Sequence, residues 1–134
     1  MPKTDIIKIN KDEIKCIVKN NNTKKIIEFI KSKGYKIIIL TNEGIDLIIY
    51  FNKRIYKMFI PENIETEYTI GLGDIFNSVF VKSYIKEEDP LWSASLGIAV
   101  TNICKKKTGI DKINWNKNIE QIAHNIYQKS FRLH

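Results

Sequence analysis

Short β-branched runs alternate with helical spacings of apolar residues over the first half of the chain. The runs predict strands over residues 6–9, 36–41, 46–51 and 54–60. The second run is almost wholly β-branched, which is typical of a strand that is buried on both faces of a helix-covered sheet. The third and fourth runs predict a hairpin that turns at Asn52 and Lys53.

Apolar residues at spacings of three and four predict helices in other segments. These segments are residues 11–19, 23–33, 73–86, 90–107 and 116–128. Gly34 and Gly109 follow two of them, and glycine is the commonest residue just past the end of a helix. Asp89 and Pro90 fit the cap and the first turn of the fourth helix. The order of elements predicts an α/β fold in which helices cover a sheet.

The length of 134 residues predicts one domain with enough chain for a hydrophobic core. A hydrophobic content of 43% and a charged content of 28% are ordinary for a folded soluble protein. The apolar runs are too short to span a membrane and no secretory leader opens the chain, so we expect a cytoplasmic protein without a membrane partner. In that compartment we expect Cys16 and Cys104 to be reduced, buried thiols.

The net charge of +7 and the sequence pI of about 9.3 raise nucleic acid as a partner. The lysines are scattered through every predicted element, however, beside a heavy use of Ile and Asn that indicates a compositional bias. The one run, Lys105–Lys107, falls at a predicted helix end, where cations are favoured. We therefore expect no dedicated nucleic-acid surface, and an attraction for polyphosphates fits the charge equally well.

The most informative segment places Gly71 and Gly73 on either side of one residue, with Asp74 following where a helix is expected to begin. Glycine permits positive φ and lets the backbone approach a ligand closely. A helix that begins there directs unpaired N–H groups and the positive end of its dipole at a ligand in front of it. A carboxylate among anion-binding amides suggests phosphoryl transfer. The alternative is that Asp74 only caps a helix after a glycine turn.

The segment from Gly71 to Phe76 resembles the G-A-G-D-x-F signature of ribokinase-like (PfkB-type) sugar kinases. Residues 5–13 are similar to the family's strand followed by N-x-x-E, residues 33–41 to its buried strand and nucleotide-contacting threonine, and residues 94–109 to its small-residue helix. The resemblance covers nearly the whole chain and corresponds to the carboxyl-terminal half of such a kinase. It implies a three-layer ribokinase-like half-domain, an α/β fold with a mostly parallel central sheet, a β-hairpin and flanking helices, as a single nucleotide-binding domain over residues 1–134.

In this family the aspartate that corresponds to Asp74 is the catalytic base, which accepts the proton of a substrate hydroxyl. The resemblance implies phosphoryl transfer from ATP, with Mg²⁺, to a hydroxyl of a sugar or nucleoside. The amides of Gly71, Leu72 and Gly73 would form the anion hole around the transferred group. ADP stays open as the donor, because residues 70–74 also resemble the corresponding stretch of archaeal ADP-dependent sugar kinases.

The resemblance also implies contacts with the nucleotide and the metal. The nucleotide-binding candidates are Asn10, Thr41, Ile98, Thr101 and Asn102, and Glu13 is the candidate that orients Mg²⁺ through water. Each has a structural alternative. Asn10 and Glu13 also fit the cap and third residue of a helix. Thr41 also fits a β-branched strand, and the small residues of the segment 94–109 also fit close helix packing.

Two places depart from the family pattern. Tyr68 stands where the family commonly has an aspartate that helps to hold a monovalent cation, and residues 41–46 lack a glycine of its T-x-G-x-x-G pattern. The family's sugar-binding residues come from its amino-terminal half, so we expect a homodimer or a separate partner of that kind at the strand 6–9. The alternative functions are a non-catalytic nucleotide-binding or interaction remnant of such a kinase and a basic nucleic-acid-binding module.

Overall fold

The computed structural model describes residues 6–19, 22–42, 46–60, 72–106 and 117–133. The chain divides into two compact units, which we describe separately. The sheet unit contains Met1–Phe59 and Phe131–His134, and the helical unit contains Ile60–Ser130. The single domain expected from the length stays a prediction.

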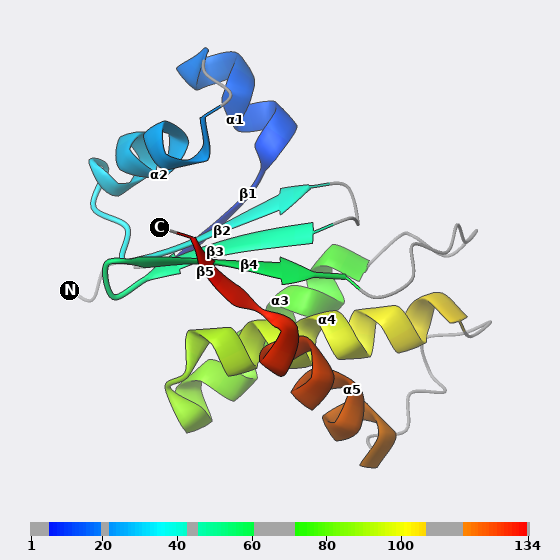
Figure 1. The fold of residues 1–134 in the computed structure, drawn as a ribbon. Helices are drawn as coiled ribbons and strands as arrows, with labels where there is room; N and C mark the ends of the chain where they lie inside the picture. Colours follow the sequence, from blue (N-terminus) through cyan, green and yellow to red (C-terminus); the bar gives the residue numbers. More distant parts are fainter. Residues whose placement is uncertain (1–5, 20–21, 43–45, 61–71, 107–116, 134) are drawn as a thin grey trace. The chain divides into compact units, whose positions relative to one another are not determined.

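The sheet unit is built on a five-stranded sheet with the order β1-β2-β3-β4-β5 (Figure 1). The strands are β1 (Ile6–Asn10), β2 (Ile37–Asn42), β3 (Asp46–Phe51), β4 (Arg54–Phe59) and β5 (Phe131–Leu133). β1 is parallel to β2, and the other three neighbouring pairs are antiparallel. The expected α/β class with a hairpin is confirmed. A mostly parallel sheet is wrong for the described strands, because the hairpin and the last strand both add antiparallel neighbours.

Two short helices, α1 (Lys11–Val18) and α2 (Thr23–Lys31), lie over the same face of this sheet (Figure 1). Their apolar sides meet alternate residues of the strands in one hydrophobic cluster. Its buried members are Ile14, Ile26, Ile27, Ile30, Ile38, Leu40, Ile48 and Tyr50. Burying an isoleucine side chain contributes about 1.5–3 kcal/mol, so this cluster stabilises the packing of α1 and α2 on the sheet.

Local signals in the sequence explain how these elements begin and turn. The side chain of Asn22 accepts hydrogen bonds from the backbone N–H groups of Lys24 and Lys25 at the start of α2. Asn52 and Lys53, at φ 52° and 63°, connect β3 to β4 in the left-handed conformation that a two-residue hairpin turn requires. The predicted hairpin is therefore confirmed at the predicted residues.

The strand β5 was not predicted. It is three residues long and pairs with β4, with Ile55 opposite Leu133. The rings of Phe59 and Phe131, 5.8 Å apart between centroids, meet across this pair. So short a segment carries no alternation that could distinguish it from the end of the preceding helix.

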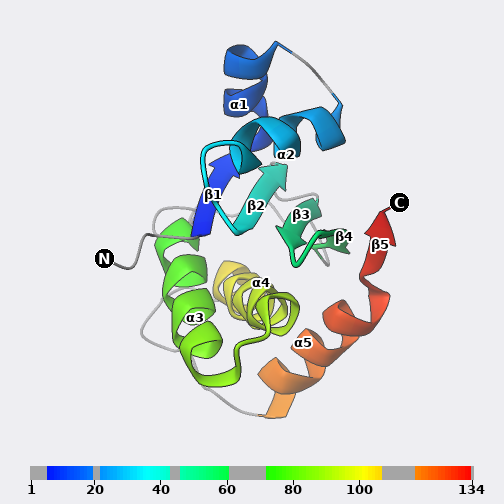
Figure 2. The ribbon, with the colours of Figure 1, turned by 90° about the vertical axis from the view of Figure 1, so that its left-hand side faces the viewer.

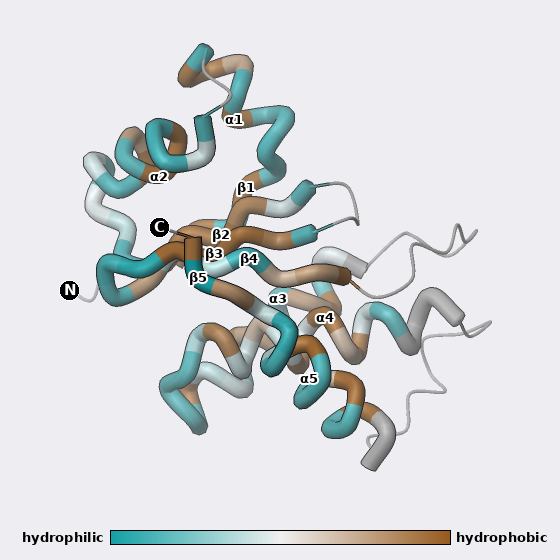
Figure 3. The backbone as a smooth tube through the Cα atoms, in the orientation of Figure 1, coloured by the Kyte–Doolittle hydropathy of each residue, from teal (hydrophilic) through white to brown (hydrophobic). Residues whose placement is uncertain are grey.

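The helical unit contains α3 (Leu72–Glu87), α4 (Pro90–Lys106) and α5 (Lys117–Lys129). α4 packs against both α3 and α5, and Figure 2 shows α3 beside α4. The predicted cap of α4 is confirmed, since the backbone N–H of Trp92 donates to Oδ1 of Asp89 at 3.1 Å. Figure 3 shows α5 with alternating apolar and polar segments. Its buried residues Ile119, Ala123 and Ile126 recur at the predicted helical spacing.

α3 and α4 approach closely at Gly97. A Cβ atom built on Gly97 would lie 2.7 Å from Cδ2 of Phe76, so the ring occupies the space that any larger residue would need. Phe76, Phe80 and Tyr84 form a stacked row of rings along α3, with centroids about 6 Å apart. Gly97 thus serves close helix packing, which is one of the two interpretations of the segment 94–109.

The sequence predicts a buried thiol at Cys16. Cys16 is exposed, so the expectation of a buried thiol at this position is wrong. It lies on the outer side of α1, whose Ile14 faces the cluster.

No helix among the described residues is both long enough and apolar enough to cross a membrane.

Candidate functional site

Asp74 is the third residue of α3 and is exposed. The N–H groups of the first helical turn have no partner from the helix ladder and carry the positive end of its dipole. A carboxylate at this position is stabilised by that dipole and remains open to solvent. Asp74 is thus an exposed carboxylate in a first helical turn, and its role as the base stays a prediction.

The three residues expected to form the anion hole are described to different extents. Leu72 and Gly73 are the first two residues of α3, and Gly73 is exposed. Gly71 lies outside the described residues. The helix begins one residue earlier than the sequence pattern predicts, so the backbone N–H groups of Leu72 and Gly73 belong to its unpaired first turn.

The parallel pair of strands brings Asn10 and Thr41 together. They are register partners at the carboxyl ends of β1 and β2, and both are half-buried. Ile9 packs on the cluster under α1 and α2. Because side chains alternate along a strand, Asn10 and Thr41 belong to the opposite face. Ligands of open α/β sheets bind beyond the carboxyl ends of parallel strands, so the two residues share a favourable position for a phosphate contact.

Asn10 also caps α1. Its Oδ1 accepts a hydrogen bond from the backbone N–H of Asp12 at 2.8 Å. This bond occupies the oxygen and leaves the side-chain NH₂ group to donate, which is the polarity that a phosphate oxygen requires. Glu13 lies one residue further along the first turn of α1 and is exposed.

The three candidates on α4 have little exposed surface. Ile98 and Asn102 are 3% and 4% exposed, and Thr101 is half-buried. The hydroxyl of Thr101 donates to the backbone carbonyl of Gly97 at 2.6 Å. Among the described residues, Oδ1 of Asn102 has no hydrogen-bond partner. Of the three, Thr101 offers the most surface to a nucleotide.

The candidate residues thus fall into two groups. Asn10, Glu13 and Thr41 belong to the sheet unit, and Asp74 belongs to the helical unit with the candidates of α4. Within the described part of the chain, no cluster of three or more His, Cys, Asp or Glu residues could hold a metal ion directly. The water-mediated role of Glu13 toward Mg²⁺ stays a prediction.

Sequence reasoning missed one polar contact near this edge of the sheet. Asp46, at the start of β3, is 7% exposed and pairs in register with Asn42, which follows Thr41. Nζ of Lys57 lies 3.6 Å from Oδ2 of Asp46. The pair could not be recognised because its two members are eleven residues apart on two strands, and only the hairpin register brings them together.

Neither the family models nor the curated proteins include a match to this sequence. Solved structures with a similar fold include a putative ribokinase II from E. coli, which aligns with 91% of this chain and 39% of its own, at a TM-score of 0.73 and 15% identity. Arabidopsis thaliana ribokinase complexed with ribose and ATP aligns with 89% of this chain and 40% of its own, at a TM-score of 0.71 and 15% identity.

A third similar structure is a pyrophosphate-dependent kinase in the ribokinase family, solved as a sulfate complex. It aligns with 78% of this chain and 37% of its own, at a TM-score of 0.65 and 22% identity. At these identities the likeness shows the fold alone. The chain has a ribokinase-like fold and spans about two fifths of the length of these kinases.

Proposed function

We propose that this ribokinase-like chain is the nucleotide-binding part of a phosphotransferase of the sugar or nucleoside kinase type. In this proposal a phosphoryl group passes from ATP to an alcohol hydroxyl, and Asp74 is the base. The observation that carries the proposal is the exposed carboxylate of Asp74 in the first turn of α3. A solvated carboxylate beside unpaired N–H groups can meet a hydroxyl and a phosphate at the same time.

The carboxylate of Asp74 accepts the hydroxyl proton while the oxygen forms its bond to phosphorus and the bond to the leaving phosphate breaks. General base catalysis of this kind contributes about 10²–10⁴-fold to a rate. Phosphoryl transfer has a loose transition state, in which positioning and neutralisation of charge contribute more than the base. The base alone therefore does not account for the rate of such an enzyme.

Charge on the transferred group is met by the first turn of α3. The backbone N–H groups of Gly71, Leu72 and Gly73 are the proposed donors, of which the last two belong to the described helix. Removing a single donor of an oxyanion hole typically costs about 10²–10³-fold in rate. These donors are on the backbone, so replacing a side chain does not remove them. A substitution of Gly71 or Gly73 tests them only by changing the backbone conformation.

The donor phosphates are proposed to contact the carboxyl ends of β1 and β2. The NH₂ group of Asn10 and the hydroxyl of Thr41 are both hydrogen-bond donors, and the two residues lie opposite each other in the register. Mg²⁺, when bound, would neutralise phosphate charge, and Glu13 would hold it through water. The exposure of Glu13 fits this outer role.

The proposal is tested with Asp74→Asn, which keeps the size of the side chain and removes the base. The donors to be tested are ATP, ADP and pyrophosphate, because one structure of similar fold is a pyrophosphate-dependent kinase. We expect kcat with sugar or nucleoside acceptors to fall by about 10²-fold or more, while the donor Kd changes little. Glu28→Gln, at an exposed position of α2, is the matched control. A loss of less than about tenfold in the Asp74 variant would remove this residue as the base.

A second candidate is a non-catalytic nucleotide-binding or interaction remnant of such a kinase. Its support is the length of the chain, about two fifths of the similar kinases, together with Tyr68 and the altered pattern at residues 41–46. Calorimetry measures nucleotide binding, and an activity assay measures turnover with the sugar and nucleoside acceptors. Binding without turnover selects this candidate.

We also propose that β1 receives a partner, either a second copy of the chain or a separate amino-terminal half. In the described sheet β1 has a single neighbour, β2, and its five residues are all half-buried. A strand at the edge of a sheet is a template for pairing with another chain. Analytical ultracentrifugation checks this, and a monomer at all concentrations contradicts the homodimer.

A further inference from the structure

A cleft of about 500 Å³ lies within the helical unit, lined by residues of α3, α4 and α5. This volume is in the range of small-molecule sites in proteins. The residues of α3 that line it include Ser78, Lys82 and Lys86, which recur every four positions and so form one side of the helix. The two lysines lie about 12 and 18 Å beyond Asp74 along the helix axis, at 1.5 Å per residue, so this is a separate place on α3.

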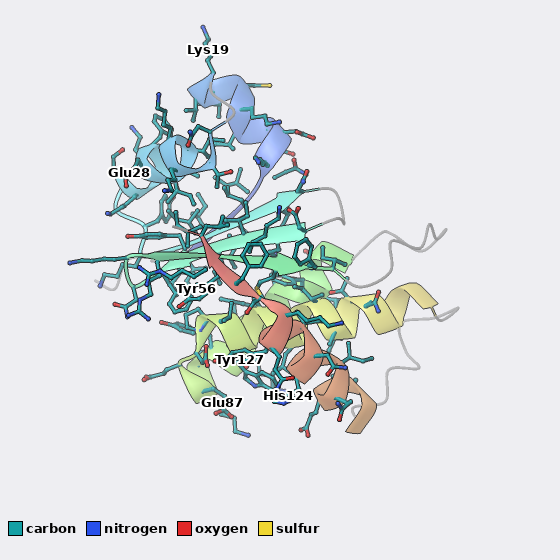
Figure 4. The ribbon with its side chains drawn as sticks, in the orientation of Figure 1. Lys19, Glu28, Tyr56, Glu87, His124 and Tyr127 are labelled. Atoms are coloured by element: carbon teal, nitrogen blue, oxygen red, sulfur yellow. The ribbon has the colours of Figure 1, made fainter. Side chains whose placement is uncertain are left out.

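Trp92 and Leu96 of α4 supply an apolar surface in the cleft. The indole of Trp92 is half-buried and meets the ring of Tyr127 edge to face, with 5.9 Å between centroids and 72° between planes. Tyr127 and His124 are labelled on α5 in Figure 4, with Glu87 at the end of α3. A half-exposed indole that is held by a second ring presents a fixed, flat face, which favours a planar apolar group in a ligand.

The hydroxyl group of Ser83, which lines the cleft, is hydrogen-bonded to a buried serine. Oγ of Ser93, which is fully buried, donates to Oγ of Ser83 at 3.1 Å. Ser83 lines the cleft, and because it accepts from Ser93 its own proton can be donated elsewhere. Together with the ammonium groups of Lys82 and Lys86, this hydroxyl gives the α3 side of the cleft three hydrogen-bond donors.

Acidic residues line the same cleft. Glu120 comes from α5, and Glu87 comes from the last turn of α3. Two lysines and two glutamates make the formal charge of the lining zero. A simple anion would be attracted by one pair and repelled by the other. A ligand with an anionic end and a cationic end satisfies both pairs.

We propose that this cleft binds a small aromatic zwitterion, such as an aromatic amino acid. The carboxylate of the ligand contacts Lys82, Lys86 and the hydroxyl of Ser83, its ring packs on Trp92, and its ammonium group contacts Glu120. The inference does not depend on the proposed phosphotransferase activity, because every residue in it lies outside the site around Asp74.

The test uses L-phenylalanine, whose ring does not interfere with tryptophan fluorescence, and follows the emission of Trp92 on titration. We expect saturable quenching with a Kd of about 1 mM or lower, as for a ligand of this size. The variant Trp115→Phe is used as the background, so that Trp92 is the one tryptophan in the titrated protein. Phenylalanine amide, which lacks the carboxylate, and N-acetylphenylalanine, which lacks the ammonium group, are each expected to bind about tenfold more weakly.

Two variants separate the ends of the ligand. The double variant Lys82→Gln/Lys86→Gln weakens phenylalanine about tenfold and leaves the amide nearly unchanged, whereas Glu120→Gln weakens phenylalanine and leaves the N-acetyl form nearly unchanged. Lys24→Gln/Lys25→Gln, at exposed positions of α2, is the matched control with the same change of charge. All the substituted side chains are exposed, so the variants keep the fold. Absence of quenching at about ten times the expected Kd, or equal affinity for all three compounds, overturns the proposal.

Discussion

The two units of the chain differ most in charge. The sheet unit, Met1–Phe59 with Phe131–His134, contains fourteen Lys and Arg residues and six Asp and Glu residues, whereas the helical unit, Ile60–Ser130, contains eight and nine. The whole positive excess of the chain therefore belongs to the sheet unit, at +8 against −1. The proposed phosphate contacts lie in the basic unit and the proposed base lies in the nearly neutral one. Attraction of a polyphosphate and removal of a proton are thus assigned to different parts of the chain.

The helices of the two units also differ. α1 and α2 each have a single buried side, formed by Ile14 in one and by three isoleucines in the other. α4 is buried at every position from Ser93 to Val100. A one-sided helix tolerates charge on its outer surface, and a helix buried on all sides does not. The burial of α4 therefore explains why the lysines of the chain are absent from its central turns.

The two variants with the largest expected effects test whether phosphate contact and proton removal depend on different residues. Thr41→Val removes the hydroxyl at the end of β2, while Asp74→Asn removes the base. We expect the threonine variant to raise the donor KM about tenfold with a small change in kcat, and the aspartate variant to lower kcat about 10²-fold or more with a small change in KM. Steady-state kinetics measure both. If both variants change the same constant, the proposed division is wrong.

The next effect tests whether the two units unfold together. Ile38 is fully buried in the cluster beneath α1 and α2, and Ile38→Ala is expected to cost about 2–5 kcal/mol. Urea unfolding is followed by far-ultraviolet circular dichroism and by tryptophan fluorescence, which reports on the helical unit because Trp92 and Trp115 both belong to it. A single domain predicts that both transitions shift by the same amount. A fluorescence transition that stays at the wild-type midpoint shows independent units.

Two glycines provide a smaller and more local comparison. Gly97→Ala places a Cβ 2.7 Å from the ring of Phe76, and we expect overpacking to cost about 1–3 kcal/mol. Gly34 has φ +99° and open space around its Cα, so Gly34→Ala is penalised by backbone conformation alone, at about 1 kcal/mol. Thermal unfolding of both variants checks this order. A smaller loss at Gly97 than at Gly34 would show that α3 and α4 separate easily.

The sequence predicted elements wherever the determining contacts are local. The hairpin turn depends on Asn52 and Lys53 themselves, and the start of α4 depends on a bond between Asp89 and Trp92, three residues apart. The position of Asp74 in a first helical turn was predictable for the same reason. Contacts between distant residues were not predictable. β5 pairs Leu133 with Ile55, across more than half of the chain.

The candidate site shows the same limit. The strand run ending at Thr41 indicated a strand end, but only the parallel register places Asn10 opposite it. The burial of Ile98 and Asn102 follows from helix packing that spacing along one helix does not reveal. The cleft that contains Trp92 is lined by residues of three helices, so no single segment of the sequence could have indicated it.

The smallest expected effect concerns salt. Because the sheet unit carries the whole positive excess, its like charges repel one another, and ions screen that repulsion. Raising NaCl from about 0.02 to about 0.5 M should stabilise the protein by less than about 1 kcal/mol, measured by urea unfolding. Lys24→Gln/Lys25→Gln in the sheet unit should reduce this gain, and Lys82→Gln/Lys86→Gln in the helical unit, with an equal change of charge, should leave it intact. An equal reduction in both double variants would show that the charge acts on the molecule as a whole and that the contrast between the units has no energetic consequence.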